Sequence, residues 1–204
     1  MMTMNALISM LIGYALGCIQ SAYLIGRLFG KLDIREQGSG NAGASNITST
    51  MGVKYGVIVG LIDILKGVFA VIIVKWVYPA SPNLAFLSGL MAIIGHMFPF
   101  YLRFRGGKGV ATLIGMMIGT NWKLGLLFVL LVVLPALATD YIVAGSLSAF
   151  IALPIVSFLS GYPILILAFS LGLTGLCFYL HRNNIQRILA GEELRIRAVI
   201  FKKK

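Results

Sequence analysis

The chain has 204 residues, of which 59% are apolar and only 11% charged. A water-soluble domain carries about 25% charged residues, so this composition excludes an ordinary soluble globular protein and a disordered chain. The 17 Lys and Arg residues against 6 Asp and Glu give a net charge of +11. In a membrane protein such an excess indicates anionic lipid headgroups, cytoplasmic loops and anionic substrates, and we expect no nucleic-acid partner.

Seven apolar runs follow one another along the chain, and each is long enough, or nearly so, to cross a bilayer. The fourth run has only about 13 residues against the roughly 20 that a span needs, so six or eight spans remain alternatives. Every span should be helical, because lipid offers no partner for free backbone polar groups. The sequence predicts an all-α, polytopic integral membrane protein with one transmembrane domain over residues 1–204. The runs cover residues 5–26, 53–75, 83–102, 109–121, 123–139, 141–160 and 162–180.

Glycine is frequent inside these runs and recurs there after four residues. Small residues at this spacing share one helix face and let two helix backbones approach closely. The three pairs are Gly13 with Gly17, Gly56 with Gly60, and Gly115 with Gly119.

Basic residues fall almost entirely on one side of a seven-span topology. The loops after the first and third runs, together with the tail after the seventh, hold 14 of them, and the opposite side holds Lys75 and Lys123. The positive-inside rule then predicts an outside N-terminus and a cytoplasmic C-terminus. The 14 residues are Arg27, Lys31, Arg35, Lys54, Arg103, Arg105, Lys108, Arg182, Arg187, Arg195, Arg197, Lys202, Lys203 and Lys204.

Three polar segments lie on this predicted cytoplasmic side: Gly38–Asn46, Gly106–Thr112 and His181–Arg187. Glycines allow backbone N–H groups to converge on an anion. Lys108 precedes a predicted helix start, where the helix dipole favours negative charge. One glycine-rich loop alone is usually a turn, and one basic tail alone is usually a lipid-facing surface. The three segments together predict a shared site for a phosphate-containing ligand.

A nucleotide-binding P-loop does not fit the second segment. That motif needs Ser or Thr directly after its Gly-Lys pair, and here Gly109 follows Lys108.

The ordered set of segments resembles the bacterial acyl-phosphate-dependent glycerol-3-phosphate acyltransferases, which have seven spans and three cytoplasmic motifs. The first motif is similar to Gly38–Asn46 with Ser45 in place of Thr, and the other two match Gly106–Thr112 and His181–Arg187. The resemblance implies transfer of a fatty acyl group from acyl phosphate to glycerol-3-phosphate, giving lysophosphatidic acid and phosphate. It also implies a monomer without cofactor or metal, in contact with membrane lipids, in the bacterial inner membrane with its active site facing the cytoplasm.

The resemblance assigns site residues by matching positions. His181 is the first candidate for the general base, because imidazole titrates near neutrality, and the donor phosphate itself is the alternative. The catalytic candidates are His181, Lys108 and Asn184. The substrate- and phosphate-binding candidates are Ser39, Gly40, Asn41, Gly43, Ser45, Asn46, Gly106, Gly107, Gly109, Thr112, Arg182 and Arg187.

Two charged residues, Asp63 and Lys66, lie three apart inside the second predicted span. Charges within a membrane are functional candidates by default, and a structural ion pair is the alternative. His96, near the cytoplasmic end of the third span, is expected to pack or to make a helix-end hydrogen bond.

Two positions depart from the family pattern. Ser49 stands where members usually carry Arg, and Asp140 stands where they tend to carry a basic residue. Because a cation is lost and an acid gained, one alternative is a diverged paralogue that binds phosphate or lipid with another acceptor or without catalysis. A small transporter of a phosphorylated solute is a separate alternative, although the sequence shows no internal repeat of the kind that transporters often have.

Overall fold

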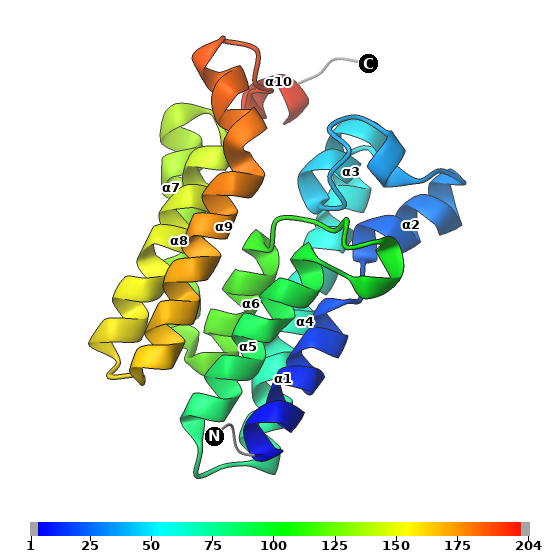
Figure 1. Cartoon of the computed structure of the whole chain (residues 1–204). Coiled ribbons are helices and arrows are strands. Elements are labelled where there is room, and N and C mark those ends of the chain that lie inside the picture. The colour runs from blue at the N-terminus through cyan, green and yellow to red at the C-terminus, as the bar shows by residue number, and fades with distance from the viewer. Residues whose placement is uncertain (1–3, 201–204) are drawn as a thin grey trace. The chain divides into compact units, whose positions relative to one another are not determined.

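The computed structural model describes residues 4–200, so Lys202, Lys203 and Lys204 of the predicted basic tail lie outside the described residues. Every regular element in the described range is helical, which confirms the predicted fold class (Figure 1). The α-helices are α1 (Met4–Gly17), α2 (Ser21–Gly30), α3 (Ala44–Met51), α4 (Val53–Val77), α5 (Pro82–Met97), α6 (Val110–Thr120), α7 (Trp122–Thr139), α8 (Ile142–Leu159), α9 (Ile164–Leu189) and α10 (Ile196–Ile200). The 3₁₀ helices are η1 (Ile34–Glu36) and η2 (Phe100–Leu102).

Six helical stretches of the described chain are long and apolar enough to cross a membrane. The fourth predicted run corresponds to the shorter apolar helix α6. All seven predicted runs therefore coincide with helices, while the number of spans and the orientation of the termini stay predictions. The six stretches are Met4–Gly30, Val53–Val77, Pro82–Leu102, Trp122–Thr139, Ile142–Leu159 and Ile164–Leu189.

The first run is not one continuous helix, because the chain opens between α1 and α2. Two backbone carbonyls in this break are bound by side chains from elsewhere in the chain. Tyr101 donates its hydroxyl to the Cys18 carbonyl at 2.8 Å, and the Lys66 ammonium donates to the Ile19 carbonyl at 2.7 Å. The break is stable inside a membrane segment because these donors replace the lost helical hydrogen bonds.

The contacts divide the chain into two compact units, residues 1–125 and 126–204. The expected single domain over residues 1–204 stays a prediction. In the first unit α1 packs along α5, and α4 packs against α3, α5 and α6. In the second unit α8 and α9 lie side by side (Figure 1).

The predicted glycine pairs are helix-packing contacts in the first unit. A Cβ atom on Gly13 would lie 2.0 Å from the Ser88 carbonyl oxygen of α5, and one on Gly17 would lie 2.1 Å from that of Ala92. Both distances are far below van der Waals contact, so α1 and α5 approach as closely as they do only because these positions carry no side chain.

The α6 pair behaves in the same way, but in the α4 pair only Gly56 does, because a Cβ atom on Gly60 would make an ordinary contact of 3.9 Å with Ala44. Gly115 of α6 lies against the Ile64 backbone of α4, and a Cβ atom there would be 1.9 Å from the Ile64 carbonyl oxygen. Gly119 faces Val68 and Val71 on the same helix. On α4, Gly56 lies against Thr48 of α3. Glycine therefore fixes how α3 and α6 pack on α4.

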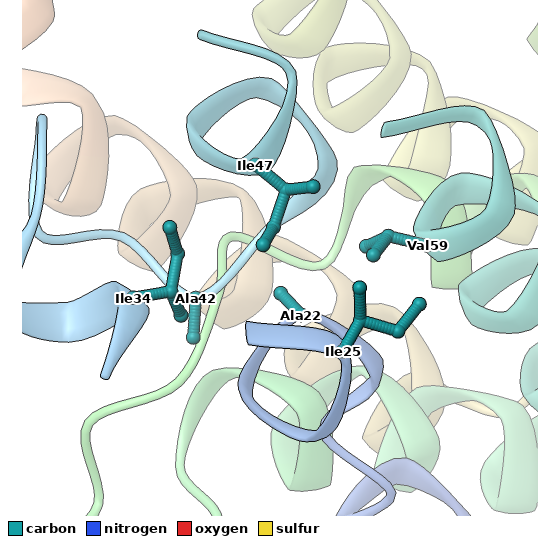
Figure 2. Close-up of a cluster of buried hydrophobic side chains, with 6 residues drawn as sticks. All are labelled: Ala22, Ile25, Ile34, Ala42, Ile47 and Val59. Atoms are coloured by element: carbon teal, nitrogen blue, oxygen red, sulfur yellow. The ribbon is translucent and has the colours of Figure 1, made fainter. Parts of the chain in front are cut away.

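A buried apolar cluster supports the polar segments of the first unit (Figure 2). It joins α2, η1, α3 and α4 with the loop that precedes α3. Each of its side chains is at most 6% exposed, so apolar burial holds the first glycine-rich segment onto the helices below it. The cluster consists of Ala22, Ile25, Ile34, Ala42, Ile47 and Val59.

Candidate functional site

A buried carboxylate shapes the chain that leads into the first glycine-rich segment. Asp33 accepts hydrogen bonds from the Arg35 backbone N–H at 3.0 Å and from the Arg35 guanidinium at 2.7 and 3.0 Å. Arg27 adds a further contact at 3.2 Å. The hydrogen bonds from Arg35 hold the pKa of the Asp33 carboxyl at about 2, well below its usual 3.8. Asp33 is therefore ionised and fixes the position of Arg35.

The first segment, Gly38–Asn46, is folded around the side chain of Asn46. Its amide nitrogen donates to the carbonyls of Ile34, Gln37 and Asn41 at 2.9 to 3.0 Å, and its oxygen accepts from the Ser39 N–H at 2.9 Å. Asn46 is 2% exposed. The side chain of Asn46, predicted to bind the substrate, therefore lies inside the loop, where it fixes the path of the backbone.

The remaining candidates of the first segment lie around this centre. Gly40 has φ +73°, a left-handed conformation that glycine adopts without strain. Gly43 directly precedes α3 and Ser45 is exposed in its first turn, next to backbone N–H groups that no helical carbonyl accepts. Ser39 is exposed and Asn41 is half-buried. These side chains and N–H groups are placed where an anion can reach them.

The second segment begins with a tight turn between η2 and α6. Arg103 and Phe104 both have left-handed backbone, with φ +55° and +58°, which costs about 1 kcal/mol or more for each non-glycine residue. The chain then folds back on the end of α5, because the Gly106 N–H donates to the Met97 carbonyl and the Gly107 N–H to the His96 carbonyl, both at 3.1 Å. The second segment is thus fastened to α5.

The helix α6 begins directly after Lys108 and Gly109. Gly109 precedes the first helical turn with φ +79°, and Lys108 is half-buried beside it. The N-terminus of an 11-residue helix offers unpaired N–H groups and the positive end of a dipole. Thr112, in the first turn, is fully buried. The prediction that Lys108 precedes a helix start is confirmed.

The two glycine-rich segments touch each other. The Ala42 N–H donates to the Gly106 carbonyl at 3.3 Å, and the Arg35 guanidinium donates to the Leu102 carbonyl at 2.9 Å. Segments that lie about 65 residues apart in the sequence therefore form one surface of the first unit. This contact is what a shared phosphate site on these two segments requires.

The third segment lies within helix α9 in the second unit. The sequence placed it after the last span, but α9 continues to Leu189. His181 is buried, and its Nδ1 atom lies 2.9 Å from the Cys177 carbonyl one turn earlier. Since a carbonyl only accepts, Nδ1 carries a proton, and when the ring is neutral Nε2 holds the lone pair that a general base needs.

Glu193 is a functional candidate that the sequence reading missed. Its carboxylate accepts hydrogen bonds from the Asn184 amide and, at 2.6 Å, from Arg187 Nε. It therefore orients two of the predicted site residues. The signal in the sequence is the pair of successive acids, Glu192 and Glu193, that follows Gly191. Arg182 is exposed and stacks on Tyr179, with 4.0 Å between the guanidinium carbon and the ring centre.

The two departures from the family pattern have local partners. Ser49 is exposed and donates its hydroxyl to the Asn46 carbonyl at 2.9 Å. Asp140 accepts from the N–H groups of Ile196 and Arg197, through its carbonyl at 2.9 Å and its carboxylate at 3.0 Å. Asp140 thus attaches the start of α10 to the turn between α7 and α8.

The comparisons with known proteins agree with this geometry. The model of the family described as glycerol-3-phosphate acyltransferase matches residues 7–191. The chain belongs to the glycerol-3-phosphate acyltransferase family. The glycerol-3-phosphate acyltransferase of a Bradyrhizobium species is 42% identical over 193 residues, which cover 94% of this chain and 95% of that protein. This confirms the resemblance that the three motifs indicated.

Solved structures of the family have the same fold. The chain resembles the crystal structure of PlsY (YgiH), an integral membrane glycerol 3-phosphate acyltransferase, in its glycerol 3-phosphate form, with 34% identity and a TM-score of 0.86. The match covers 98% of this chain and 99% of that one. The lysophosphatidic acid form of the same protein matches 96% of this chain, also at 34% identity, with a TM-score of 0.81. The chain is therefore a multi-pass integral membrane protein.

Proposed function

We propose that this chain transfers a fatty acyl group from acyl phosphate to glycerol-3-phosphate, releasing lysophosphatidic acid and inorganic phosphate. One observation carries the proposal: in a member of this family, the two glycine-rich segments meet at Ala42 and Gly106, beside the start of α6 and Lys108. Backbone N–H groups, a helix N-terminus and an ammonium at one place suit a ligand with phosphate oxygens. We propose that the protein works as a monomer in the inner membrane, with this surface facing the cytoplasm.

The reaction balances without a further reactant. A hydroxyl oxygen of glycerol-3-phosphate attacks the acyl carbonyl carbon, the bond from that carbon to the phosphate oxygen breaks, and phosphate leaves. An acyl phosphate is a mixed anhydride and is already activated, so the enzyme has to bring two anions together and align the hydroxyl. The family resemblance assigns the hydroxyl proton to His181, and the leaving phosphate is the alternative acceptor.

The positions of the first-unit residues support specific roles for them. Lys108 and the N–H groups of the two glycine-rich segments neutralise phosphate charge and the developing oxyanion. Asn46 acts on the substrate indirectly, by shaping the first segment, since its amide is already saturated by backbone groups. The family resemblance assigns Arg182, Arg187 and Asn184 to substrate binding and catalysis, and within the second unit Glu193 holds Asn184 and Arg187 in place.

Acyl transfer by the purified protein in detergent or lipid tests the proposal. Labelled glycerol-3-phosphate is offered with palmitoyl phosphate, palmitoyl-CoA or acylated carrier protein in parallel. We expect lysophosphatidic acid with palmitoyl phosphate alone, and a loss of at least 100-fold in Lys108→Ala, which removes a charged partner of phosphate. Lys123→Ala is the control, because Lys123 lies beyond the far end of α6, about 16 Å along its axis.

Two results would contradict the proposal. Product from palmitoyl-CoA or from acylated carrier protein, but not from palmitoyl phosphate, would reject the donor. No product from any donor, with a folded and monodisperse protein, would reject glycerol-3-phosphate as the acceptor and favour a diverged paralogue.

A further inference from the structure

A network of charged side chains is buried in the first unit, beneath the two glycine-rich segments. Asp63 and Lys66 on α4 and His96 at the end of α5 are 1%, 3% and 3% exposed. The Lys66 Nζ atom lies 2.8 Å from Asp63 Oδ1, so the ion pair anticipated from the sequence is present. Ser21, at the start of α2, also donates to Asp63 Oδ1 at 2.8 Å. Three helices and the α1–α2 break thus converge on one polar centre.

The hydrogen bonds of Lys66 determine where its protons lie. Its Nζ atom has three neighbours, Asp63 Oδ1 at 2.8 Å, the Ile19 carbonyl at 2.7 Å and His96 Nδ1 at 2.7 Å. An ammonium has three protons and directs one to each neighbour. With Lys66 charged, the pair with Asp63 is neutral overall. A neutral Lys66 would leave a buried carboxylate without a counter-charge, which is far more costly.

The protonation of His96 follows from this arrangement. His96 Nδ1 lies 2.7 Å from the Lys66 ammonium and 3.5 Å from Asp63 Oδ1. The nearer neighbour is a donor, so we infer that Nδ1 presents its lone pair to Lys66. The ring is then neutral and carries its single proton on Nε2. A doubly protonated ring would direct an N–H toward the ammonium and is excluded. Gln20 fixes the backbone at the same point by donating to the His96 carbonyl at 3.0 Å.

The Nε2 atom of His96 is directed at the meeting point of the two glycine-rich segments. A Cβ atom on Gly107 would lie 2.1 Å from Nε2 and 2.9 Å from the Ala42 carbonyl oxygen. Glycine at this position is what leaves the ring nitrogen uncovered. Within the described part of the chain, Nε2 makes no hydrogen bond. Among the described residues, the buried side-chain polar atoms without a hydrogen-bond partner are Gln20 Oε1 and Thr112 Oγ1, and His96 Nε2 is not one of them. Nε2 is therefore accessible beside Gly107, where an oxygen atom of a ligand can accept its proton in a hydrogen bond.

We propose that His96 is a further substrate-binding residue, whose Nε2–H donates to a phosphate oxygen of a substrate bound beside Gly107. Lys66 and Asp63 are positioning residues that keep the proton on Nε2 and hold the ring against Gly107. The proposal rests on the proposed function for the identity of the ligand. The oxygen belongs to glycerol-3-phosphate or to acyl phosphate, which share this chemistry.

Nitrogen NMR of histidine tests the proton position without an activity measurement. The sequence has two histidines, so a ¹⁵N-histidine-labelled His181→Asn protein shows the His96 ring alone. We expect a protonated, pyrrole-type Nε2 and an unprotonated Nδ1 near neutral pH. We also expect the Nε2–H signal to move when glycerol-3-phosphate, palmitoyl phosphate or inorganic phosphate is added, and the most effective probe identifies the substrate. A proton on Nδ1, or a signal unmoved by all three probes at saturating concentration, would overturn the proposal.

Kinetics separate binding from a purely structural role. His96→Leu removes the donor, and we expect KM for one of the two phosphate substrates to rise about 10- to 100-fold, since a hydrogen bond to a charged group contributes about 1.5–3 kcal/mol. His96→Gln keeps an N–H near the Nε2 position and should recover most of this loss. Equal KM changes for both substrates, or no recovery in His96→Gln, would assign His96 a structural role. Absence of acyl transfer by the wild-type protein would instead reject the proposed function, and the NMR result would stand by itself.

Discussion

Asp33 offers a quantitative test of how the first glycine-rich segment is held. Its side chain is 3% exposed and receives hydrogen bonds from Arg35 and Arg27. These hydrogen bonds keep the pKa of Asp33 at about 2 instead of 3.8, and those from Arg35 have the largest effect. One pKa unit corresponds to about 1.4 kcal/mol. The charge of Asp33 therefore stabilises the folded state by about 2.4 kcal/mol at neutral pH.

The pH at which this stabilisation disappears follows from the direction of the change. The folded protein holds the Asp33 proton more weakly than the unfolded chain, so the stabilisation is complete above the unfolded pKa and is lost as the pH falls toward 2. We expect Asp33→Asn to lower the free energy of unfolding by about 2 kcal/mol at pH 7. Near pH 2 the variant and the wild type should differ little.

Reversible unfolding in detergent micelles, followed across this pH range, measures the difference. Glu36→Gln is the matched control, because Glu36 is an exposed acid on the same 3₁₀ helix. The control should change stability by less than about 0.5 kcal/mol. This role of Asp33 would be refuted if Asp33→Asn lowers the free energy of unfolding no more than the control does at pH 7, or lowers it equally at pH 2 and pH 7.

Two further predictions concern the first segment and the helix contacts. Asn46→Ala leaves three backbone carbonyls and one N–H without their partner, so we expect a loss of about 2–4 kcal/mol in unfolding experiments and a raised KM for glycerol-3-phosphate. Asn46→Asp should lower stability at least as much, because it places a carboxylate against the same carbonyls. Wild-type stability of either variant would disprove that Asn46 holds the loop through these hydrogen bonds. Gly115→Ala would force α6 away from α4, since its Cβ atom would lie 1.9 Å from a carbonyl oxygen. We expect little folded protein by size-exclusion chromatography, whereas Gly172→Ala, with no atom within 4 Å of its Cβ position, should fold normally, and equal yields would contradict the packing argument.

The sequence predicted the helices well because the membrane imposes a length and an apolar composition on each of them. It did not predict the break between α1 and α2, since run 5–26 is mostly apolar and contains neither a charged residue nor a proline. The break depends on donors that reach it from Tyr101 and Lys66, far away in the chain. The glycine spacing, in contrast, was enough to predict close helix contacts, because residues four apart lie on the same face of a helix.

In the candidate site, too, the sequence predicted what short motifs encode and missed what depends on contacts between distant residues. Motif spacing located the loops, and the structure brings the first two together. The role of Asn46 was not accessible, because its amide is saturated by carbonyls whose positions depend on the fold of the loop. The sequence identified Asp140 only as an acid at a position where the family tends to carry a basic residue. In the structure its oxygens bind the start of α10, an arrangement that no short motif encodes.

The two histidines illustrate why residue type alone does not assign a catalytic role. His181 donates from Nδ1 to the carbonyl of Cys177, four residues earlier in the same helix, which leaves Nε2 as an acceptor. His96 accepts at Nδ1 from Lys66, thirty residues away, which leaves Nε2 as a donor. Acyl transfer from an acyl phosphate needs both kinds of group: an acceptor for the hydroxyl proton and donors for phosphate oxygens. The contact of His181 with the Cys177 carbonyl follows from helix geometry and can be predicted from the sequence. The contact of His96 with Lys66 requires the fold, because only the packing of α4 against α5 brings the ammonium to the ring.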